Sequence, residues 1–150
     1  MLRWLYLVTK EFFQIFRHWY KVQTYPKADL QIRKVSYGDH SQQYYLECWI
    51  PEKERNDRPL IVFIHGGGWQ FAKPDYFTAN AHRLASMGFR VIMPCHRKIF
   101  RYRYADMRED LNLVNTAIAQ LPIAQRGVIL GGMSSGGNLS AHQGLDPQYP

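Results

Sequence analysis

Two glycine-rich stretches carry the residue types that could do chemistry. The stretch IVFIHGGGWQF occupies residues 61–71, and VILGGMSSGGNLS occupies residues 128–140. The second contains the pattern G-x-S-x-G, with Ser134 at its centre. That pattern is typical of a strand that turns abruptly into a helix, which holds the serine at a strained corner with its hydroxyl projecting into a site. Small flanking residues are needed there, because a side chain would collide with the facing backbone.

Backbone amides in these two stretches could hold a developing negative charge. Ser134 lies near the N-terminus of a predicted helix, where unpaired N–H groups favour an anion, and the N–H of Ser135 would point at that charge. Acyl transfer needs two or three such donors around the tetrahedral oxyanion. Gly67 and Gly68 can bring their N–H groups against a substrate without obstruction by a side chain. The two stretches together therefore suit acyl transfer.

The surrounding pattern predicts the elements that position these stretches. Residues 60–64 are apolar on both faces, which suits a parallel strand covered by helices on both sides. From there strands and helices alternate, which predicts right-handed crossovers and a mainly parallel sheet, preceded by an antiparallel hairpin. Both glycine-rich stretches follow strands, at the sheet edge where open parallel sheets bind ligands. The predicted strands are 32–38, 44–51, 60–64, 90–94 and 127–130, and the predicted helices are 78–88, 105–121 and one starting near Ser135.

The pairing of HGGGW with GGMSSGGN about 65 residues later resembles the α/β-hydrolase superfamily, in particular the hormone-sensitive-lipase-like esterases with their HGGG loop. The resemblance covers roughly residues 30–145. It implies an α/β-hydrolase fold that is truncated, with its C-terminal strands missing. It also implies a serine carboxylic-ester hydrolase that attacks small acyl esters through an acyl-enzyme and needs no cofactor or metal ion. Amide or peptide substrates would fit the same machinery.

The resemblance assigns roles to individual residues. Ser134 would be the nucleophile, and the N–H groups of Gly67, Gly68 and Ser135 would be the oxyanion donors. The residues that would support the two motifs are His65, Gly66, Trp69, Gly132 and Gly136. Met133 and Ser135 occupy places often filled by Asp and Ala, which is tolerable because the backbone makes the oxyanion contacts.

Phosphate binding is the alternative use of a glycine-rich turn between a strand and a helix. Residues 132–137 fit the G-x-x-x-x-G part of a phosphate-binding loop, but Asn138 stands where that loop needs lysine. No G-x-G-x-x-G follows residue 64, so the dinucleotide fingerprint fails as well. Acyl transfer remains the favoured chemistry.

A base for the serine is missing from this sequence. The superfamily order is Ser, then Asp or Glu, then His, yet Asp146 and His142 are the only such residues after Ser134. His142 lies eight positions along the predicted helix, about 12 Å from the corner at 1.5 Å per residue. His65 belongs to the glycine loop, and His96 follows a strand about 10 Å away at 4.8 Å per strand. The remaining histidines, His18, His40 and His82, are expected at the surface, so no triad acid or base is assigned.

Two interpretations follow from the missing base. The chain could be the N-terminal part of a longer hydrolase, or it could be an inactive fragment or one half of a two-chain hydrolase. In either case the strand 127–130 would be an unprotected edge, and an apolar edge strand invites self-association.

The first 24 residues predict an amphipathic helix in front of the hydrolase part, residues 25–150. Its apolar stripe comprises Leu2, Leu5, Val8, Phe12, Ile15, Phe16, Trp19 and Tyr20. Charged residues interrupt the stripe, so no run of about 20 apolar residues could span a bilayer. We expect this helix to dock on its own domain, and the alternative is peripheral contact with a membrane surface. The predicted location is cytoplasmic, with membrane association as that alternative.

Charge and cysteine content add little about function. The net charge of +7 is concentrated in residues 1–34 and in HRKIFRYRY, residues 96–104. Basic residues interleaved with aromatic ones could contact nucleic acid, but no nucleic-acid fold accompanies them, so we expect a partly packed loop and no nucleic-acid partner. Cys48 and Cys95 are expected as buried free thiols.

Overall fold

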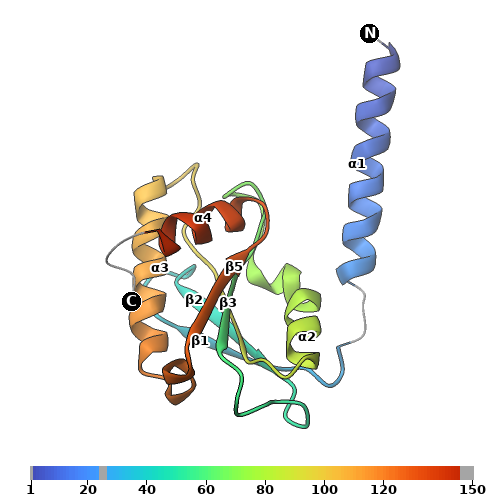
Figure 1. Ribbon diagram of the computed structural model, residues 1–150. Coiled ribbons are helices and arrows are strands. Elements are labelled where there is room, and N and C mark those ends of the chain that lie inside the picture. Colours follow the sequence, from blue (N-terminus) through green and yellow to red (C-terminus); the bar gives the residue numbers. More distant parts are fainter. Residues whose placement is uncertain (1, 24–26, 146–150) are drawn as a thin grey trace.

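The computed structural model describes residues 2–23 and 27–145 and contains a five-stranded mixed sheet with helices on both faces (Figure 1). The strands are β1 (Gln31–Ser36), β2 (Tyr44–Trp49), β3 (Leu60–Ile64), β4 (Val91–Pro94) and β5 (Val128–Gly132). The α-helices are α1 (Leu2–Gln23), α2 (Thr78–Ser86), α3 (Tyr104–Ala119) and α4 (Ser135–Gly144), and short 3₁₀ helices cover Pro74–Phe77 and Pro122–Arg126.

The strand order is β1-β2-β4-β3-β5. The hairpin β1–β2 and the pair β2–β4 are antiparallel, whereas β4–β3 and β3–β5 are parallel. In the β3–β5 register Leu60 pairs with Val128 and Ile64 with Gly132. The two strands therefore end side by side, and the glycine-rich segments that follow them leave the sheet at the same edge. The predicted fold class is confirmed.

The interior strand β3 is buried on both faces, as its continuous apolar sequence predicts. Ile61 packs with Ala81 and Ala85 of α2 on one face. Leu60 and Val62 pack with α3 on the other face. Alternate residues of one strand thus join the two helix layers that flank the sheet in Figure 1. The predicted apolar face of α3 is confirmed by the buried side chains of Met107, Leu111, Val114 and Ile118.

Gly88 ends α2 as predicted. Its φ of +92° lies in the left-handed region that glycine adopts without strain, and an added Cβ would lie 2.8 Å from Cγ of Arg55. This turn directs the chain into β4.

The free thiols are buried as expected, because Cys48 and Cys95 are both enclosed by the core. Burial raises the pKa of the Cys48 thiol to about 12. His82, expected at the surface, is in fact buried, and its Nε2 lies 2.7 Å from Oδ1 of Asp29. Asp29 lies in the segment before β1, and its carboxylate is the polar partner of this ring. The sequence of α2 alone could not predict this contact.

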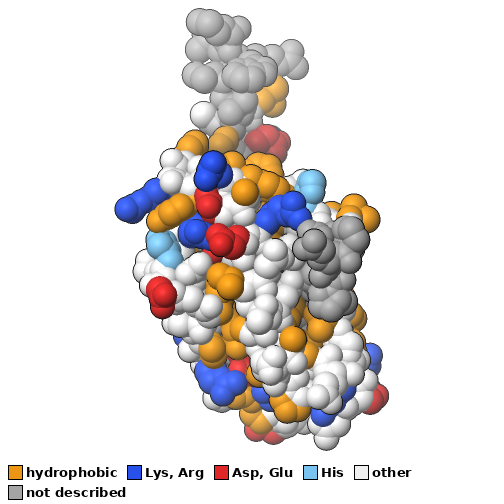
Figure 2. Space-filling model, turned by 90° about the vertical axis from the view of Figure 1, so that its left-hand side faces the viewer, with side chains coloured by type: hydrophobic (Ala, Val, Ile, Leu, Met, Phe, Trp, Pro, Cys, Tyr) orange, Lys and Arg blue, Asp and Glu red, His pale blue; other side chains and the backbone are white. Residues whose placement is uncertain are grey.

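The described side chains of α1 do not pack on the sheet domain as expected, and the helix approaches α2 and the 3₁₀ helix Pro74–Phe77. Figure 1 shows α1 running away from the domain, with only its C-terminal end near α2. Phe12, Phe13 and Ile15 are 72%, 69% and 64% exposed. Within the described ranges no helix is long and apolar enough to cross a bilayer. On the face of the molecule that Figure 2 shows, acidic side chains lie among the basic ones, so the positive charge does not form one continuous patch there.

Candidate active site

The corner between β5 and α4 has the strained geometry that its sequence predicts. Ser134 lies between the two elements with φ +54° and ψ −122°, and its side chain is exposed. A positive φ is uncommon for a residue with a side chain and costs about 1–3 kcal/mol, which surrounding contacts must offset. Ser135 begins α4, so its N–H has no partner within the helix.

The two glycines of the G-x-S-x-G pattern are there because β3 passes close to the corner. A Cβ on Gly132 would lie 2.5 Å from the carbonyl of Gly136 and 2.7 Å from the oxygen of Ile64. A Cβ on Gly136 would collide with the carbonyl oxygens of Ile64 and His65. The end of β3 therefore dictates glycine at both positions.

The two glycine-rich stretches meet at this corner. The N–H of Met133 donates to the carbonyl of Ile64 at 3.2 Å. A Cβ built on Gly66 would lie 2.9 Å from the oxygen of Met133 and 3.3 Å from Cβ of Ser134. The HGGG loop thus starts in contact with the backbone that carries the serine.

The HGGG loop is a tight turn with bare backbone. Gly67, Gly68 and Trp69 have φ values of +118°, +59° and +61°. The carbonyl of Gly67 accepts from the amides of Gln70 at 3.1 Å and Phe71 at 2.8 Å. In the part of the chain that the structure describes, the amides of Gly67 and Gly68 donate to no backbone carbonyl. The turn thus leaves two N–H groups available for another acceptor.

His65 is held beneath this loop. Its Nδ1 lies 2.7 Å from the carbonyl of Gly66, which can only accept, so Nδ1 carries the proton and Nε2 faces Nζ of Lys98 at 3.4 Å as an acceptor. The His65 ring stacks on His96 with centroids 5.0 Å apart. Burial, with the Lys98 charge adding to it, lowers the pKa of His65 to about 3 and that of His96 to about 4. Both rings are neutral, enclosed and committed to loop contacts.

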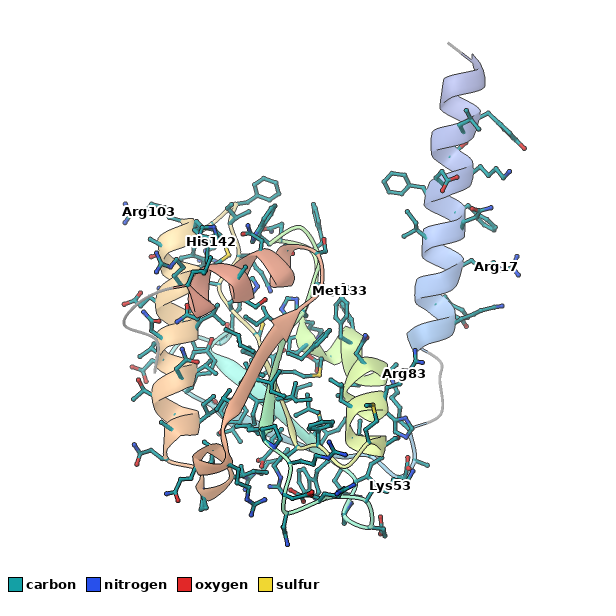
Figure 3. The ribbon with its side chains drawn as sticks, viewed as in Figure 1. Arg17, Lys53, Arg83, Arg103, Met133 and His142 are labelled. Carbon is teal, nitrogen blue, oxygen red and sulfur yellow. The ribbon has the colours of Figure 1, made fainter. Side chains whose placement is uncertain are left out.

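The other histidines whose side chains are described have partners other than Ser134. His40 lies 2.7 Å from the hydroxyl of Tyr102, and His82 pairs with Asp29 as described above. His142 meets Tyr104 edge-on with ring centroids 5.7 Å apart. Figure 3 shows His142 at the opposite end of α4 from Met133. The side chain of His18 lies outside the described residues. Among the described residues no hydrogen bond joins a histidine to Ser134, and no triad base is assigned there.

The basic segment 96–104 braces the loop. Arg97 donates from Nε to Oδ1 of Asp110 at 2.9 Å, and its backbone N–H donates to Oδ2 at 2.7 Å. The amides of Ile99 and Phe100 donate to the Trp69 carbonyl and to Oε1 of Gln70. The expected packing of this segment is therefore confirmed. The buried Asp110 and Lys98 support this segment and the loop through contacts that sequence reasoning missed, since their partners lie on other elements.

Among the described residues, no three His, Cys, Asp or Glu side chains converge as metal ligands would.

A sheet of this order, with a serine at the strand-to-helix corner beside a glycine loop, defines the α/β-hydrolase fold. Esterase B from Lactobacillus rhamnosis superposes with a TM-score of 0.71 at 21% identity, over 90% of this chain and 46% of that protein. A hyperthermophilic esterase from the archaeon Pyrobaculum calidifontis superposes with a TM-score of 0.63 at 20% identity, over 90% and 45%. Within this class, the family model BD-FAE matches residues 46–149, and the chain belongs to the BD-FAE family.

The chain spans about half the length of these solved structures. Among curated proteins, the FAD-linked oxidoreductase pytB of Aspergillus terreus is 27% identical over 100 residues, which are 63% of this chain and 12% of that protein. The shared region is thus a small part of that relative.

Proposed function

We propose that this chain supplies the nucleophile and the oxyanion hole of a serine carboxylic-ester hydrolase that acts on small acyl esters through an acyl-enzyme. The observation that carries the proposal is the contact between Gly66 and the Ser134 corner. It puts a strained, exposed serine beside a turn in which, among the described residues, the amides of Gly67 and Gly68 donate to no backbone carbonyl. The esterases among the similar solved structures and the membership of the BD-FAE family support it.

In the proposed reaction Oγ of Ser134 attacks the ester carbonyl, and the carbonyl oxygen becomes negative. The N–H groups of Gly67, Gly68 and Ser135 donate to that oxygen. Collapse of the tetrahedral intermediate expels the alcohol and leaves the acyl group on Oγ, and water then releases the acid. The proton of Ser134 must pass to a base. The described histidines do not provide one. We therefore expect Ser134 to be acylated only when an external base is added, and the chain by itself to turn over poorly.

Acetylation of Ser134 by p-nitrophenyl acetate, with imidazole added as an external base, tests this half-reaction. We expect mass spectrometry of the digested chain to find acetyl on Ser134 at least about 100-fold faster than on other serines, since even one oxyanion donor contributes that much. Ser134→Ala should remove the acetylated peptide. Ser140→Ala, which changes another serine of α4, should not.

Unfolding the chain in urea gives the second control. A serine activated by the fold should lose its preference when the chain is unfolded. Equal acetylation of Ser134 in the folded and unfolded chain, or an unchanged rate of ester cleavage in Ser134→Ala, would contradict the proposal.

A further inference from the structure

Among the side chains of α1 that the structure describes, several large apolar ones are exposed and do not pack on the sheet domain. Tyr6, Phe12, Phe13 and Ile15 are each more than 60% exposed, and all lie on one 22-residue helix. At 1.5 Å per residue this helix is about 33 Å long. Exposed aromatic side chains clustered on one element mark an interaction surface rather than an ordinary solvated face.

Basic residues form a strip on the side of the same helix opposite Phe12 and Ile15. Lys10 and Arg17 are spaced by seven residues, and Lys21 follows four later, spacings that return to nearly the same side at about 100° per residue. On the same count Phe12 and Ile15 lie about 160° and 140° around the helix from Lys10, whereas Tyr6 and Phe13 lie only about 40° and 60° from it and flank the basic strip. Figure 3 shows Arg17 projecting from α1 away from the sheet domain.

The charge balance of α1 is one-sided. The helix has four basic residues and one acidic residue, Glu11, which leaves a net charge of +3. Its first turn holds no acidic residue. A partner that contacts both sides of this helix would need an apolar layer for the side with Phe12 and Ile15 and a negatively charged layer for the basic strip. A membrane that contains anionic lipid has these two layers at its interface.

We propose that α1 lies in the interface of an anionic membrane, with its apolar face among the acyl chains and its basic strip at the headgroups. The helix is too polar to cross the bilayer, and a large apolar face opposite Lys and Arg is the usual composition of helices that lie in the interface. The inference is independent of the proposed ester hydrolysis, because it uses no residue of the candidate active site.

Flotation of the full chain with vesicles tests the proposal, using phosphatidylcholine vesicles with or without about one third phosphatidylserine. The wild-type chain should float with the phosphatidylserine vesicles. Binding should be at least about ten-fold weaker to pure phosphatidylcholine, and weaker at about 0.5 M salt, where charges are screened within a few ångströms.

Two α1 variants separate the two faces. Lys10→Glu with Arg17→Glu should reduce binding to the anionic vesicles at least about ten-fold, since each basic residue near the surface contributes roughly a factor of five. Phe12→Ser, Phe13→Ser and Ile15→Ser together should abolish flotation with both vesicles. The matched charge control, Arg83→Glu with Arg126→Glu on exposed positions of the sheet domain, should float as the wild type does.

Far-UV circular dichroism and sedimentation velocity complete the test. The variant Lys10→Glu with Arg17→Glu keeps the apolar side chains of α1. If it loses flotation while its helix content is retained, the basic residues contribute to membrane binding. Flotation that no α1 variant changes would overturn the proposal. It would also be overturned if the wild-type chain failed to float and the serine variant converted a dimer into a monomer, which would assign the apolar face to a second copy.

Discussion

At the scale of single residues, the contacts of His65 are those of a support for the HGGG loop and do not suit a general base. Its Nδ1–H is donated to Gly66, its Nε2 faces Lys98, and its ring is 2% exposed. A general base near neutral pH would need a pKa close to 7 and access to the serine. His65 has neither, because burial lowers its pKa to about 3.

The two stacked histidines make the stability of the chain depend on pH. A histidine that titrates at 6.5 when unfolded and at about 3 or 4 when folded binds fewer protons in the folded state between those values. Stability should therefore fall as the pH falls below about 6.5, by up to about 1.4 kcal/mol per pH unit for each ring. Urea unfolding at several pH values between 4 and 7 measures this slope.

The variant His65→Gln should reduce that slope, because one of the two rings no longer titrates. The same substitution at His142, whose ring lies on the exposed part of α4, controls for the loss of an imidazole as such. A slope that His65→Gln leaves unchanged would contradict the neutral, buried assignment.

At the scale of elements, the β5–α4 corner is built around the end of β3. We expect Gly136→Ala to destabilise the chain by about 1–3 kcal/mol or more, as overpacking does, because its Cβ would collide with the carbonyls of Ile64 and His65. Gly144→Ala is the matched control in the same helix, since nothing lies within 4 Å of the added Cβ. It should be neutral or slightly stabilising. Urea unfolding midpoints compare the two variants, and equal midpoints would show that the corner is not close-packed.

The sequence could predict this corner because its signals are local. The strand before each glycine stretch, the serine between two glycines and the stop at Gly88 all depend on neighbouring residues, and all three appear in the structure. Lys98 beneath the loop and the pairing of Arg97 with Asp110 depend on residues that the fold brings together from other elements. The prediction that α1 docks on its own domain fails for its described side chains, although the signal for the helix itself is local. Its amphipathic pattern requires an apolar partner but does not say which one.

At the scale of the whole molecule, the described sheet ends in an apolar strand. Strand β5 pairs only with β3, and Val128 and Ile129 are 37% and 49% exposed. An edge of this kind offers unpaired N–H and carbonyl groups to another chain, and natural proteins commonly protect such edges with a lysine. No lysine lies in β5.

Self-association through β5 should therefore respond to a charge at its exposed position. We expect Ile129→Lys to weaken association at least about ten-fold, or about 1.4 kcal/mol, measured as the dissociation constant by sedimentation velocity over a range of concentrations. Leu113→Lys makes the same change at a partly exposed position of α3, and it should associate as the wild type does. Because α1 could also join two copies, the comparison is repeated in the variant with serine at 12, 13 and 15. Association that persists there and disappears with Ile129→Lys belongs to the sheet edge, whereas a wild-type chain that stays monomeric at all concentrations would show that the edge is protected.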